Sequence, residues 1–295
     1  MKKYNFALFT TCDSQGDRLN ELLRLLDSVD HAVQQHRLSI KHYILLQRAE
    51  NIPEQLTPRL SKDREFMMVN ERLSLSRARN VMLNRAAQDA TLENAEICAF
   101  PDDDAWYANG FLNEVSAFLM NEPNISVFSC RYGSTPIEIK HASDLQINPK
   151  PVNVGSFIQS VSSVTLFLKT KIALKNAFFD ERLGVGAKIN GGEDLDYALR
   201  SYTNSEAQVA MSRLKLVGHR DRVTWARSTY YSGSLFAIAK SARADKTIFF
   251  QLLRKIAVGF YFVLKRELKL ADYLTGLKVG ISGFFKQTLE VANFD

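Results

Sequence analysis

Residues 95–107 read AEICAFPDDDAWY, an apolar run that leads directly into Asp102, Asp103 and Asp104. Three adjacent carboxylates repel one another, and a chain rarely keeps them at the end of a strand unless a cation neutralises their charge. In open α/β sheets the carboxyl ends of the strands are where ligands bind. The segment therefore favours a ligand site at the edge of a sheet. An acidic turn that caps the next helix remains the alternative.

The flanking sequence predicts strands that alternate with helices. The apolar runs typical of strands lie at residues 4–11, 42–47, 66–70, 96–100, 125–130 and 161–169. The helical patterns lie at residues 19–29, 74–90, 109–121 and 193–201. This alternation predicts an α/β fold with a mostly parallel central sheet flanked by helices on both faces.

Composition excludes several classes of protein. The chain has 295 residues, of which 46% are hydrophobic and 24% charged, so disordered, collagen-like and coiled-coil proteins are excluded. Cys12, Cys98 and Cys130 lack the spacing of a disulfide framework or a zinc site. The beginning of the chain makes a poor signal peptide, and no run of about 18 apolar residues is present. A cytoplasmic location is therefore expected.

A second acidic group lies in residues 179–200, FDERLGVGAKINGGEDLDYALR, where Glu193 and Asp194 follow Gly191 and Gly192 at a predicted helix start. Glycines let the backbone come close to a ligand, and a helix N-terminus favours a charged carboxylate. One acid held there can remove a proton from an attacking hydroxyl group. The alternative is the ordinary preference of helices for acidic residues in their first turn.

Two further segments carry groups that suit phosphate and metal. Residues 74–80, SLSRARN, place Arg77 and Arg79 at a predicted helix start, where arginine forks and backbone amides bind phosphate. His219 follows the apolar run at residues 214–217 and is a candidate ligand of an ion held by the aspartates. A solvated helix face and a histidine without a metal are the respective alternatives.

These segments occur in an order that resembles a GT-A-fold glycosyltransferase of the large family 2 type. The matching pieces are FTTCDSQGDRLNELLRLLDSV, SLSRARNVMLNRA, FPDDDAWY, FDERLGVGAKINGGEDLDYALR and VGHRDR, which together span about residues 4–235. The resemblance implies a Rossmann-like GT-A domain over residues 1–235. The apolar clusters with interspersed Lys and Arg predict a helical appendage over residues 236–295.

The resemblance also implies roles for particular residues. The nucleotide-sugar is expected at Thr11, Asp13, Arg79, Asn80, Asp102, Asp103, Gly191 and Gly192. A divalent cation, Mn²⁺ or Mg²⁺, is expected at Asp102, Asp104 and His219. Asp194 is expected to be the catalytic base, with Glu193 beside it as a second catalytic carboxylate.

The expected activity is that of an inverting, metal-dependent hexosyltransferase. It would move a sugar from a nucleotide-sugar, expected to be a UDP-sugar, to a hydroxyl of a lipid-linked or cell-surface glycan in capsule, exopolysaccharide or lipopolysaccharide assembly. Residues 227–234, RSTYYSGS, are expected to form a loop whose tyrosines contact the sugar or the donor phosphates.

Most of the net charge of +6 lies near the end of the chain, where residues 240–295 carry ten Lys or Arg against five Asp or Glu. Because the rest is nearly neutral, nucleic acid is not an expected partner. The basic, apolar residues 236–295 are typical of helices that lie on an anionic membrane, which predicts a peripheral protein on the inner face of the plasma membrane. A cap packed on the domain, or on a second subunit in a homodimer, is the alternative.

Other classes of function remain. A nucleotidyltransferase of sugar phosphates shares the acidic metal site, but usually has a glycine-rich basic loop after its first strand. A non-catalytic membrane-binding protein would need no ordered set of acids. A two-carboxylate glycoside hydrolase would need no SRARN-type phosphate site.

Overall fold

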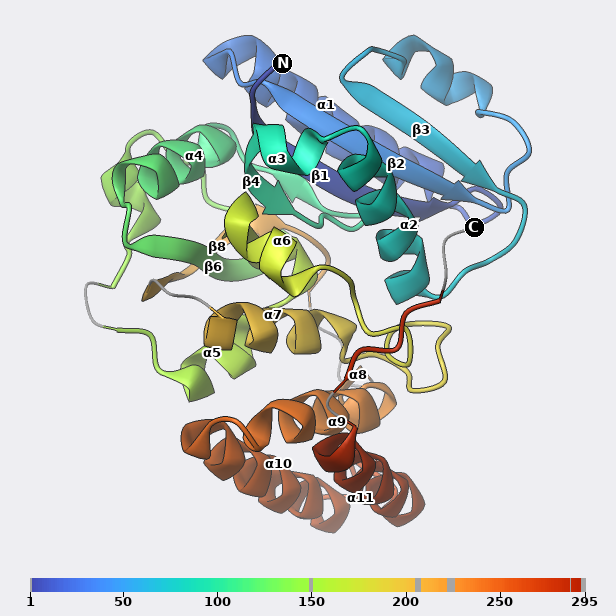
Figure 1. Ribbon diagram of the computed structural model, residues 1–295, viewed down its shortest axis with the longest axis vertical. Coiled ribbons are helices and arrows are strands. Elements are labelled where there is room, and N and C mark those ends of the chain that lie inside the picture. Colours follow the sequence, from blue (N-terminus) through green and yellow to red (C-terminus); the bar gives the residue numbers. More distant parts are fainter. Residues whose placement is uncertain (1, 149–150, 205–207, 222–225, 287, 293–295) are drawn as a thin grey trace.

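A computed structural model describes residues 2–148, 151–204, 208–221, 226–286 and 288–292. Within them eight strands form one sheet in the order β3-β2-β1-β4-β7-β6-β8-β5 (Figure 1). The strands are β1 (Tyr4–Asp13), β2 (Ile40–Gln47), β3 (Arg64–Val69), β4 (Ala95–Ala99), β5 (Trp106–Tyr107), β6 (Ile125–Gly133), β7 (Leu166–Lys169) and β8 (Gln208–Gly218).

Six of the eight described strands run in one direction. β1 pairs in parallel with β2 and β4, and β2 pairs in parallel with β3. In the rest of the sheet β7 is antiparallel to both β4 and β6, β6 is parallel to β8, and β5 is antiparallel to β8. The expected α/β architecture is confirmed. The sheet is also mostly parallel, as expected, because β6 and β8 run in the same direction as β1, β2, β3 and β4, whereas β7 and β5 run in the opposite direction.

Helices cover both faces of the sheet. They are α1 (Leu19–His36), α2 (Leu75–Gln88), α3 (Thr91–Asn94), α4 (Phe111–Asn121), α5 (Val154–Ser160), α6 (Thr170–Asn176), α7 (Glu193–Asn204), α8 (Ala226–Thr229), α9 (Tyr231–Ala242), α10 (Lys246–Leu264) and α11 (Leu270–Phe285). Short 3₁₀ turns lie at Glu54–Arg59, Ala142–Leu145 and Ser163–Thr165.

The central strand β1 is apolar on both sides, as a strand between two helical layers must be. Its alternate residues Phe6 and Leu8 belong to the core that includes α1 and α4. Ala7 and Phe9 belong to the other core, to which α2, α6, α7 and α9 contribute. The near-continuous apolar run therefore supplies two cores from one strand.

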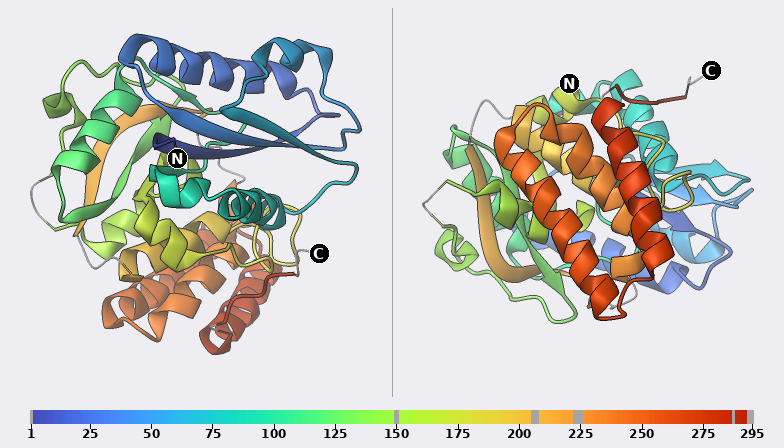
Figure 2. Two further views of the ribbon diagram at one scale, coloured as in Figure 1. Left: turned by 45° about the horizontal axis from the view of Figure 1, so that its top comes forward. Right: turned by 90° about the horizontal axis from the view of Figure 1, so that it is seen from below.

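The expected helical appendage is present as α9, α10 and α11. α10 and α11 lie side by side at the end of the molecule opposite the sheet, with α9 between them and α7 (Figure 1 and Figure 2). The division expected near residue 235 falls inside α9.

The loop expected at residues 227–234 is wrong, because the chain is mostly helical there. α8 ends at Thr229 and α9 begins at Tyr231. Tyr231 is only 3% exposed. A Cβ added to Gly259 would lie 2.1 Å from the Tyr231 hydroxyl oxygen, and one added to Gly276 would lie 2.6 Å from Tyr231 Cδ1. Tyr231 is therefore a packing residue between α9 and the two last helices. The side chain of Arg227 lies outside the described residues.

A buried group of charges joins α9 to the rest of the domain. Lys240 of α9 lies 2.6 Å from Asp180 Oδ2 and 2.9 Å from Asp196 Oδ1 of α7. Arg182 donates to Asp180 Oδ1 at 2.8 Å and to the carbonyl oxygen of Thr288 at 2.6 Å. Buried charges are expensive unless each has its partner, so these contacts fix α9, α7 and the segment after α11 relative to one another.

Replacing Lys240 with alanine should strongly destabilise the protein, because Asp180 and Asp196 would stay buried without their shared cation. The expected loss is about 3–5 kcal/mol of unfolding free energy. Urea denaturation followed by circular dichroism measures it. The matched control Lys278→Ala removes an exposed lysine of α11 and should change the unfolding free energy by less than about 0.5 kcal/mol. Equal effects of the two substitutions would contradict the structural role of Lys240.

Candidate active site

The three aspartates follow β4, which lies between β1 and β7 in the sheet. The backbone N–H of Ala105 donates to the carbonyl oxygen of Asp102 at 3.0 Å, which closes a turn. Asp103 and Asp104 are only 6% and 4% exposed. The turn therefore holds carboxylates that are largely removed from water.

Asp102, Asp104 and His219 come together as a group whose ligand atoms all lie within 4.8 Å of one another. His219 directly follows the last residue of β8, and its backbone N–H donates to the carbonyl oxygen of Gly133 at 3.0 Å. Nδ1 of His219 lies 2.9 Å from the carbonyl oxygen of Arg220, so a proton on Nδ1 leaves Nε2 as the ligand atom. Two carboxylates and one imidazole fit a divalent cation such as Mg²⁺ or Mn²⁺.

Asp104 is the strongest acid of the group. Burial by itself would raise its pKa, but the hydrogen bond from His219 and the positive charges of His219, Arg18 and Arg220 lower the pKa to about 2. The His219 Nε2 atom lies 3.1 Å from Asp104 Oδ1, and the Arg220 Nε atom lies 2.9 Å from Asp104 Oδ2. Asp104 is therefore ionised at neutral pH, as a metal ligand must be.

Two arginines at this site were missed by the sequence analysis. Arg18 lies 2.5 Å from Asp103 Oδ1 and 3.3 Å from Asp104 Oδ2. Arg220 has an exposed side chain that reaches Asp104. Both arginines stand in short polar segments of the sequence, GDR and GHR. The ion pair between Arg18 and Asp103 forms only when the sheet brings these distant residues together, so no local sequence pattern predicts it. Asp103, expected near the ribose or the sugar, is held by Arg18.

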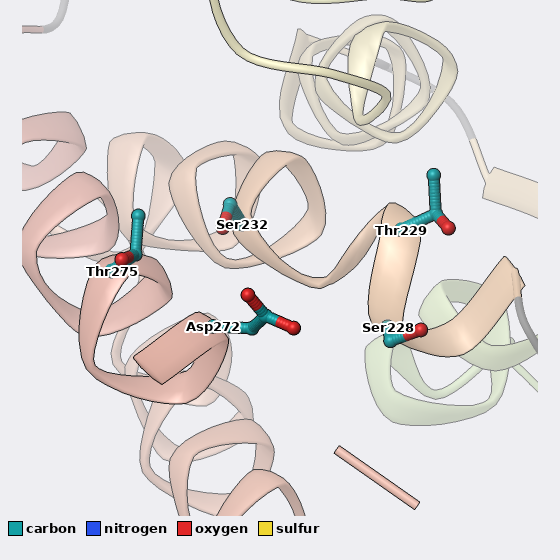
Figure 3. Close-up of a pocket in the computed structure, with 5 residues that line it drawn as sticks. All are labelled: Ser228, Thr229, Ser232, Asp272 and Thr275. Atoms are coloured by element: carbon teal, nitrogen blue, oxygen red, sulfur yellow. The ribbon is translucent and has the colours of Figure 1, made fainter. Parts of the chain in front are cut away.

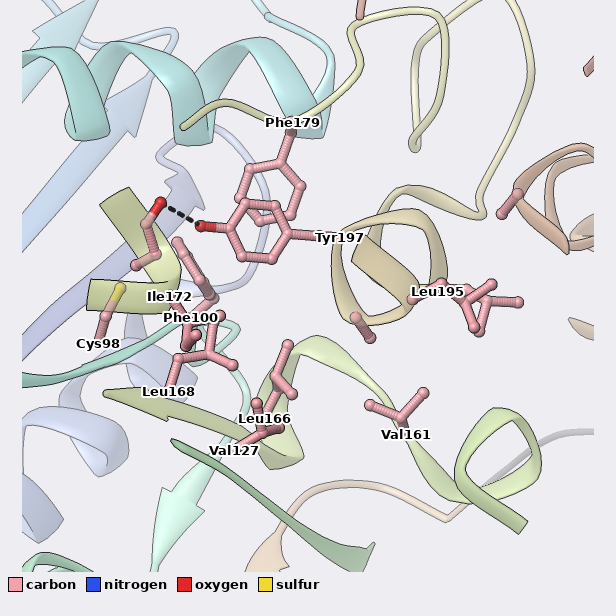
Figure 4. Packing of buried hydrophobic residues seen from close by; sticks show 14 of the residues in the cluster. Cys98, Phe100, Val127, Val161, Leu166, Leu168, Ile172, Phe179, Leu195 and Tyr197 are labelled. Carbon is pink, nitrogen blue, oxygen red and sulfur yellow. Dashed lines mark hydrogen bonds between the residues drawn. The ribbon is translucent and has the colours of Figure 1, made fainter. Parts of the chain in front are cut away.

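Arg79 connects the two acidic groups. Its side chain is almost fully buried, lies 2.9 Å from Asp102 Oδ1 and 3.8 Å from Glu193 Oε1, and sits over the ring of Phe179 at 5.2 Å. The Phe179 ring stacks on Tyr197 of α7, with centroids 4.2 Å apart (Figure 4). A buried guanidinium so close to the aspartates suits an anionic ligand.

Asn80, in contrast, does not join the acidic group. It is fully buried, donates to the carbonyl oxygen of Phe179 at 3.0 Å and to Glu181 Oε1 at 2.9 Å, and accepts from the N–H of Phe179 at 2.7 Å. Its amide therefore holds the chain at residues 179–181, and the expected contact of Asn80 with the nucleotide stays a prediction.

Gly191 and Gly192 have positive φ angles of 75° and 84°. A Cβ on Gly191 would lie 2.6 Å from Tyr230 Cδ1, and one on Gly192 would lie 2.3 Å from the backbone of Gly233. Both positions therefore need glycine for their conformation and for the close approach of α9. The glycines bring the start of α9 next to the acidic start of α7.

Glu193 and Asp194 differ in exposure. Glu193 is 6% exposed, and burial together with the charge of Asp194 raises its pKa to about 8. Asp194 is half-buried, and its Oδ1 accepts from the backbone N–H of Leu195 at 2.7 Å. Glu193 is therefore mostly protonated at neutral pH, whereas the Asp194 side chain is partly accessible to solvent.

Thr11 and Asp13 lie at the end of β1 in a second polar group. Thr11 Oγ1 accepts from Gln47 Nε2 at 2.7 Å, and Arg48 donates to both Asp13 oxygens at 2.8 Å and 2.6 Å. Gln47 Oε1 accepts from the N–H of Leu73 at 2.7 Å. These amide and guanidinium groups stand at the carboxyl ends of neighbouring parallel strands.

A separate hollow of about 260 Å³ lies between the start of α9 and α11 (Figure 3). Its lining is polar and consists of Ser228, Thr229, Ser232, Asp272 and Thr275. It contains no residue of the acidic groups.

Because the pKa of Glu193 is raised, the stability of the folded protein should depend on pH. Between pH 4.5 and about 8 the folded protein holds more protons on this residue than the unfolded chain, so stability falls as pH rises through this window. Glu193→Gln, which cannot ionise, should therefore gain melting temperature over wild type above pH 7 and match it near pH 5. Thermal unfolding of the metal-free protein across this pH range measures it. Glu93→Gln, at an exposed position of α3, should follow wild type, and parallel curves for Glu193→Gln would contradict the prediction.

Comparisons with known proteins show the fold. No model of a protein family matches the sequence, and no curated protein gives a significant match. The structure resembles S. aureus TarS 1–349 with a TM-score of 0.67 and 16% identity, covering 96% of this chain and 81% of that one.

Complexes of the same protein match equally well. TarS 1–349 with UDP-GlcNAc and with UDP each give a TM-score of 0.67 at 15% identity, with 96% of this chain and 82% and 81% of those chains covered. TarS is a glycosyltransferase of the GT-A fold. The expected GT-A fold, with a curled sheet, flanking helices and a helical C-terminal region, is thereby confirmed for this chain.

Proposed function

We propose that this protein is an inverting glycosyltransferase that takes its sugar from a UDP-sugar. The observation that carries the proposal is the arrangement of Asp102, Asp104 and His219 on one side of buried Arg79, with Glu193 beside Asp194 on the other. This arrangement lies in a fold shared with TarS, which has been crystallised with UDP and with UDP-GlcNAc. Residues 1–235 would carry this activity.

Each charged group has a part in binding the donor. Asp102, Asp104 and His219 would hold Mn²⁺ or Mg²⁺, which when bound lowers the charge of the diphosphate and makes it a better leaving group. Arg18 and Arg79 keep the aspartates in place and add positive charge where the diphosphate would lie. Thr11 and Asp13, with Gln47 and Arg48, would offer polar contacts to the nucleoside.

Asp194 would perform the proton transfer. Its carboxylate accepts the proton of the acceptor hydroxyl while that oxygen attacks the anomeric carbon. The bond from the anomeric carbon to the diphosphate oxygen breaks, and its electron pair leaves with the UDP. Configuration inverts because the attack and the departure occur on opposite faces of the sugar.

Glu193 would act through its neighbours. As a buried, mostly protonated acid it lies 3.8 Å from Arg79 without adding a full negative charge beside Asp194.

The proposed acceptor is a hydroxyl group of a lipid-linked or cell-surface glycan, in capsule, exopolysaccharide or lipopolysaccharide assembly. The support is the helical C-terminal region, whose outer side is rich in exposed apolar residues. A protein that works on such a glycan benefits from residence at the inner face of the plasma membrane.

Binding of UDP should depend on the metal and on Asp104. With UDP well above its dissociation constant and Mn²⁺ present, the melting temperature of wild type should rise by about 5 °C or more. UDP without Mn²⁺ should give a much smaller rise, and Asp104→Ala should lose the metal-dependent part. Differential scanning fluorimetry measures these shifts, with Glu93→Ala as a control that keeps them. No shift with UDP and any divalent cation would contradict a UDP-sugar donor.

Turnover should depend on Asp194 while donor binding does not. Asp194→Asn removes the base and should lower kcat by about 10²–10⁴. The measurement is release of UDP from the UDP-sugar that stabilises wild type, in the presence of bacterial membranes that supply the glycan. The stabilisation by UDP and Mn²⁺ should persist in this variant. Full turnover in Asp194→Asn would show that another group accepts the proton.

A further inference from the structure

α10 and α11 have an inner side that packs closely on α9. Gly276 and Gly283 of α11 lie so close that added Cβ atoms would meet Tyr231 Cδ1 at 2.6 Å and the carbonyl oxygen of Phe236 at 2.7 Å. Ile248 and Leu252 of α10 are buried in the same core as α9. The two helices therefore have a defined inner side, and their outer side faces away from the sheet (Figure 2).

The outer side of α10 and α11 is apolar. Sixteen large hydrophobic side chains are exposed in the described part of the chain, and ten of them lie on these two helices. The ten, called here the outer apolar face, are Phe249, Phe250, Leu253, Phe260, Tyr261, Leu264, Leu270, Leu274, Ile281 and Phe285. Soluble monomers rarely expose so many apolar side chains in one place, so this face has the character of a contact surface.

Basic residues accompany the outer apolar face. Residues 246–286 contain eight Lys or Arg and two Asp or Glu. Arg254 follows Phe250 by one helical turn, and Lys265 follows Leu264 directly, and both are exposed. Apolar side chains bordered by lysine and arginine match a bilayer interface, where acyl chains lie beneath anionic head groups.

We infer that the outer apolar face docks on the surface of an anionic lipid bilayer, with α10 and α11 lying in the plane of the interface. A second copy of this chain fits the face less well, because a symmetric contact would bring two basic surfaces together. The purpose of the docking rests on the proposed function, since it would bring the domain to a lipid-linked acceptor. The docking itself is independent of catalysis.

The in-plane arrangement follows from the packing of α10. By length and composition α10 could cross a membrane, and only 17% of its apolar window is buried. Arg254 and Lys255, however, lie at the middle of Lys246–Leu264, where a spanning helix would place them at the bilayer centre. A charged side chain at the bilayer centre is costly, and such residues are rare in membrane-spanning helices. A span would also separate α10 from α9.

Vesicle sedimentation with the full chain tests the docking. Wild type should sediment with vesicles of phosphatidylcholine mixed with phosphatidylglycerol, bind much less to phosphatidylcholine alone, and dissociate as salt rises. Phe250→Ser combined with Leu264→Ser should lower the partition coefficient by at least tenfold, because two large apolar side chains lose their burial. Arg254→Gln combined with Lys265→Gln should lower binding to the anionic vesicles.

The controls separate this inference from its alternatives and from the proposed function. Leu60→Ser combined with Leu174→Ser removes two exposed leucines, 51% and 47% exposed, outside these helices and should leave vesicle binding unchanged. UDP and Mn²⁺ should raise the melting temperature of every variant as they do for wild type. If they do not stabilise wild type, that result would contradict the proposed function and leave the docking untouched.

Three results would overturn the docking. One is no binding of wild type to anionic vesicles, and another is unchanged binding of the Phe250 and Leu264 double variant. The third is a wild-type dimer that this double variant converts to monomer, which would assign the face to a second copy. Protein that resists alkaline carbonate extraction from membranes would overturn the in-plane arrangement.

Discussion

The contact between Lys240 and the two buried carboxylates of Asp180 and Asp196 is the constraint on which the rest of the arrangement depends. Asp180 is fully buried and would be too costly to ionise without Lys240 and Arg182. Through these ions α9 is tied to α7, which begins with Glu193 and Asp194. The helix that supports α10 and α11 is thus fixed to the helix that carries the candidate base.

Gly191 and Gly192 have a structural role in this arrangement besides the one that the sequence indicates. In the sequence they indicate a backbone that comes close to a ligand. In the structure they allow Tyr230 and Gly233, at the start of α9, to lie against the segment that leads into α7. Any side chain there would push α9 away, so the glycines serve the same connection as the buried ions.

Much of the fold could be predicted from local patterns, because strands, helices and the DDD segment are each encoded over a few residues. The apolar runs at residues 4–11 and 42–47 became β1 and β2, and the helix expected from Glu193 is α7. The order of β7, β6 and β8, and the pairing of Arg18 with Asp103, could not be predicted, since they depend on distant segments meeting. The prediction of a loop at Tyr230 and Tyr231 was wrong because their polar neighbours are typical of loops. In the structure, Tyr231 packs against Gly259 and Gly276.

The layer order would limit which acceptors the protein can use if it docks as proposed. α7 packs on α9, and α9 packs on α10 and α11, so the candidate base stands two helix layers from the outer apolar face (Figure 1). Packed helix axes lie about 8–10 Å apart, so two layers put α7 about 16–20 Å from the axes of α10 and α11. A phosphate or a first sugar at the head-group level would not span that distance. If the proposed docking and the proposed base both hold, the acceptor hydroxyl would lie several sugars along a glycan that extends away from the membrane.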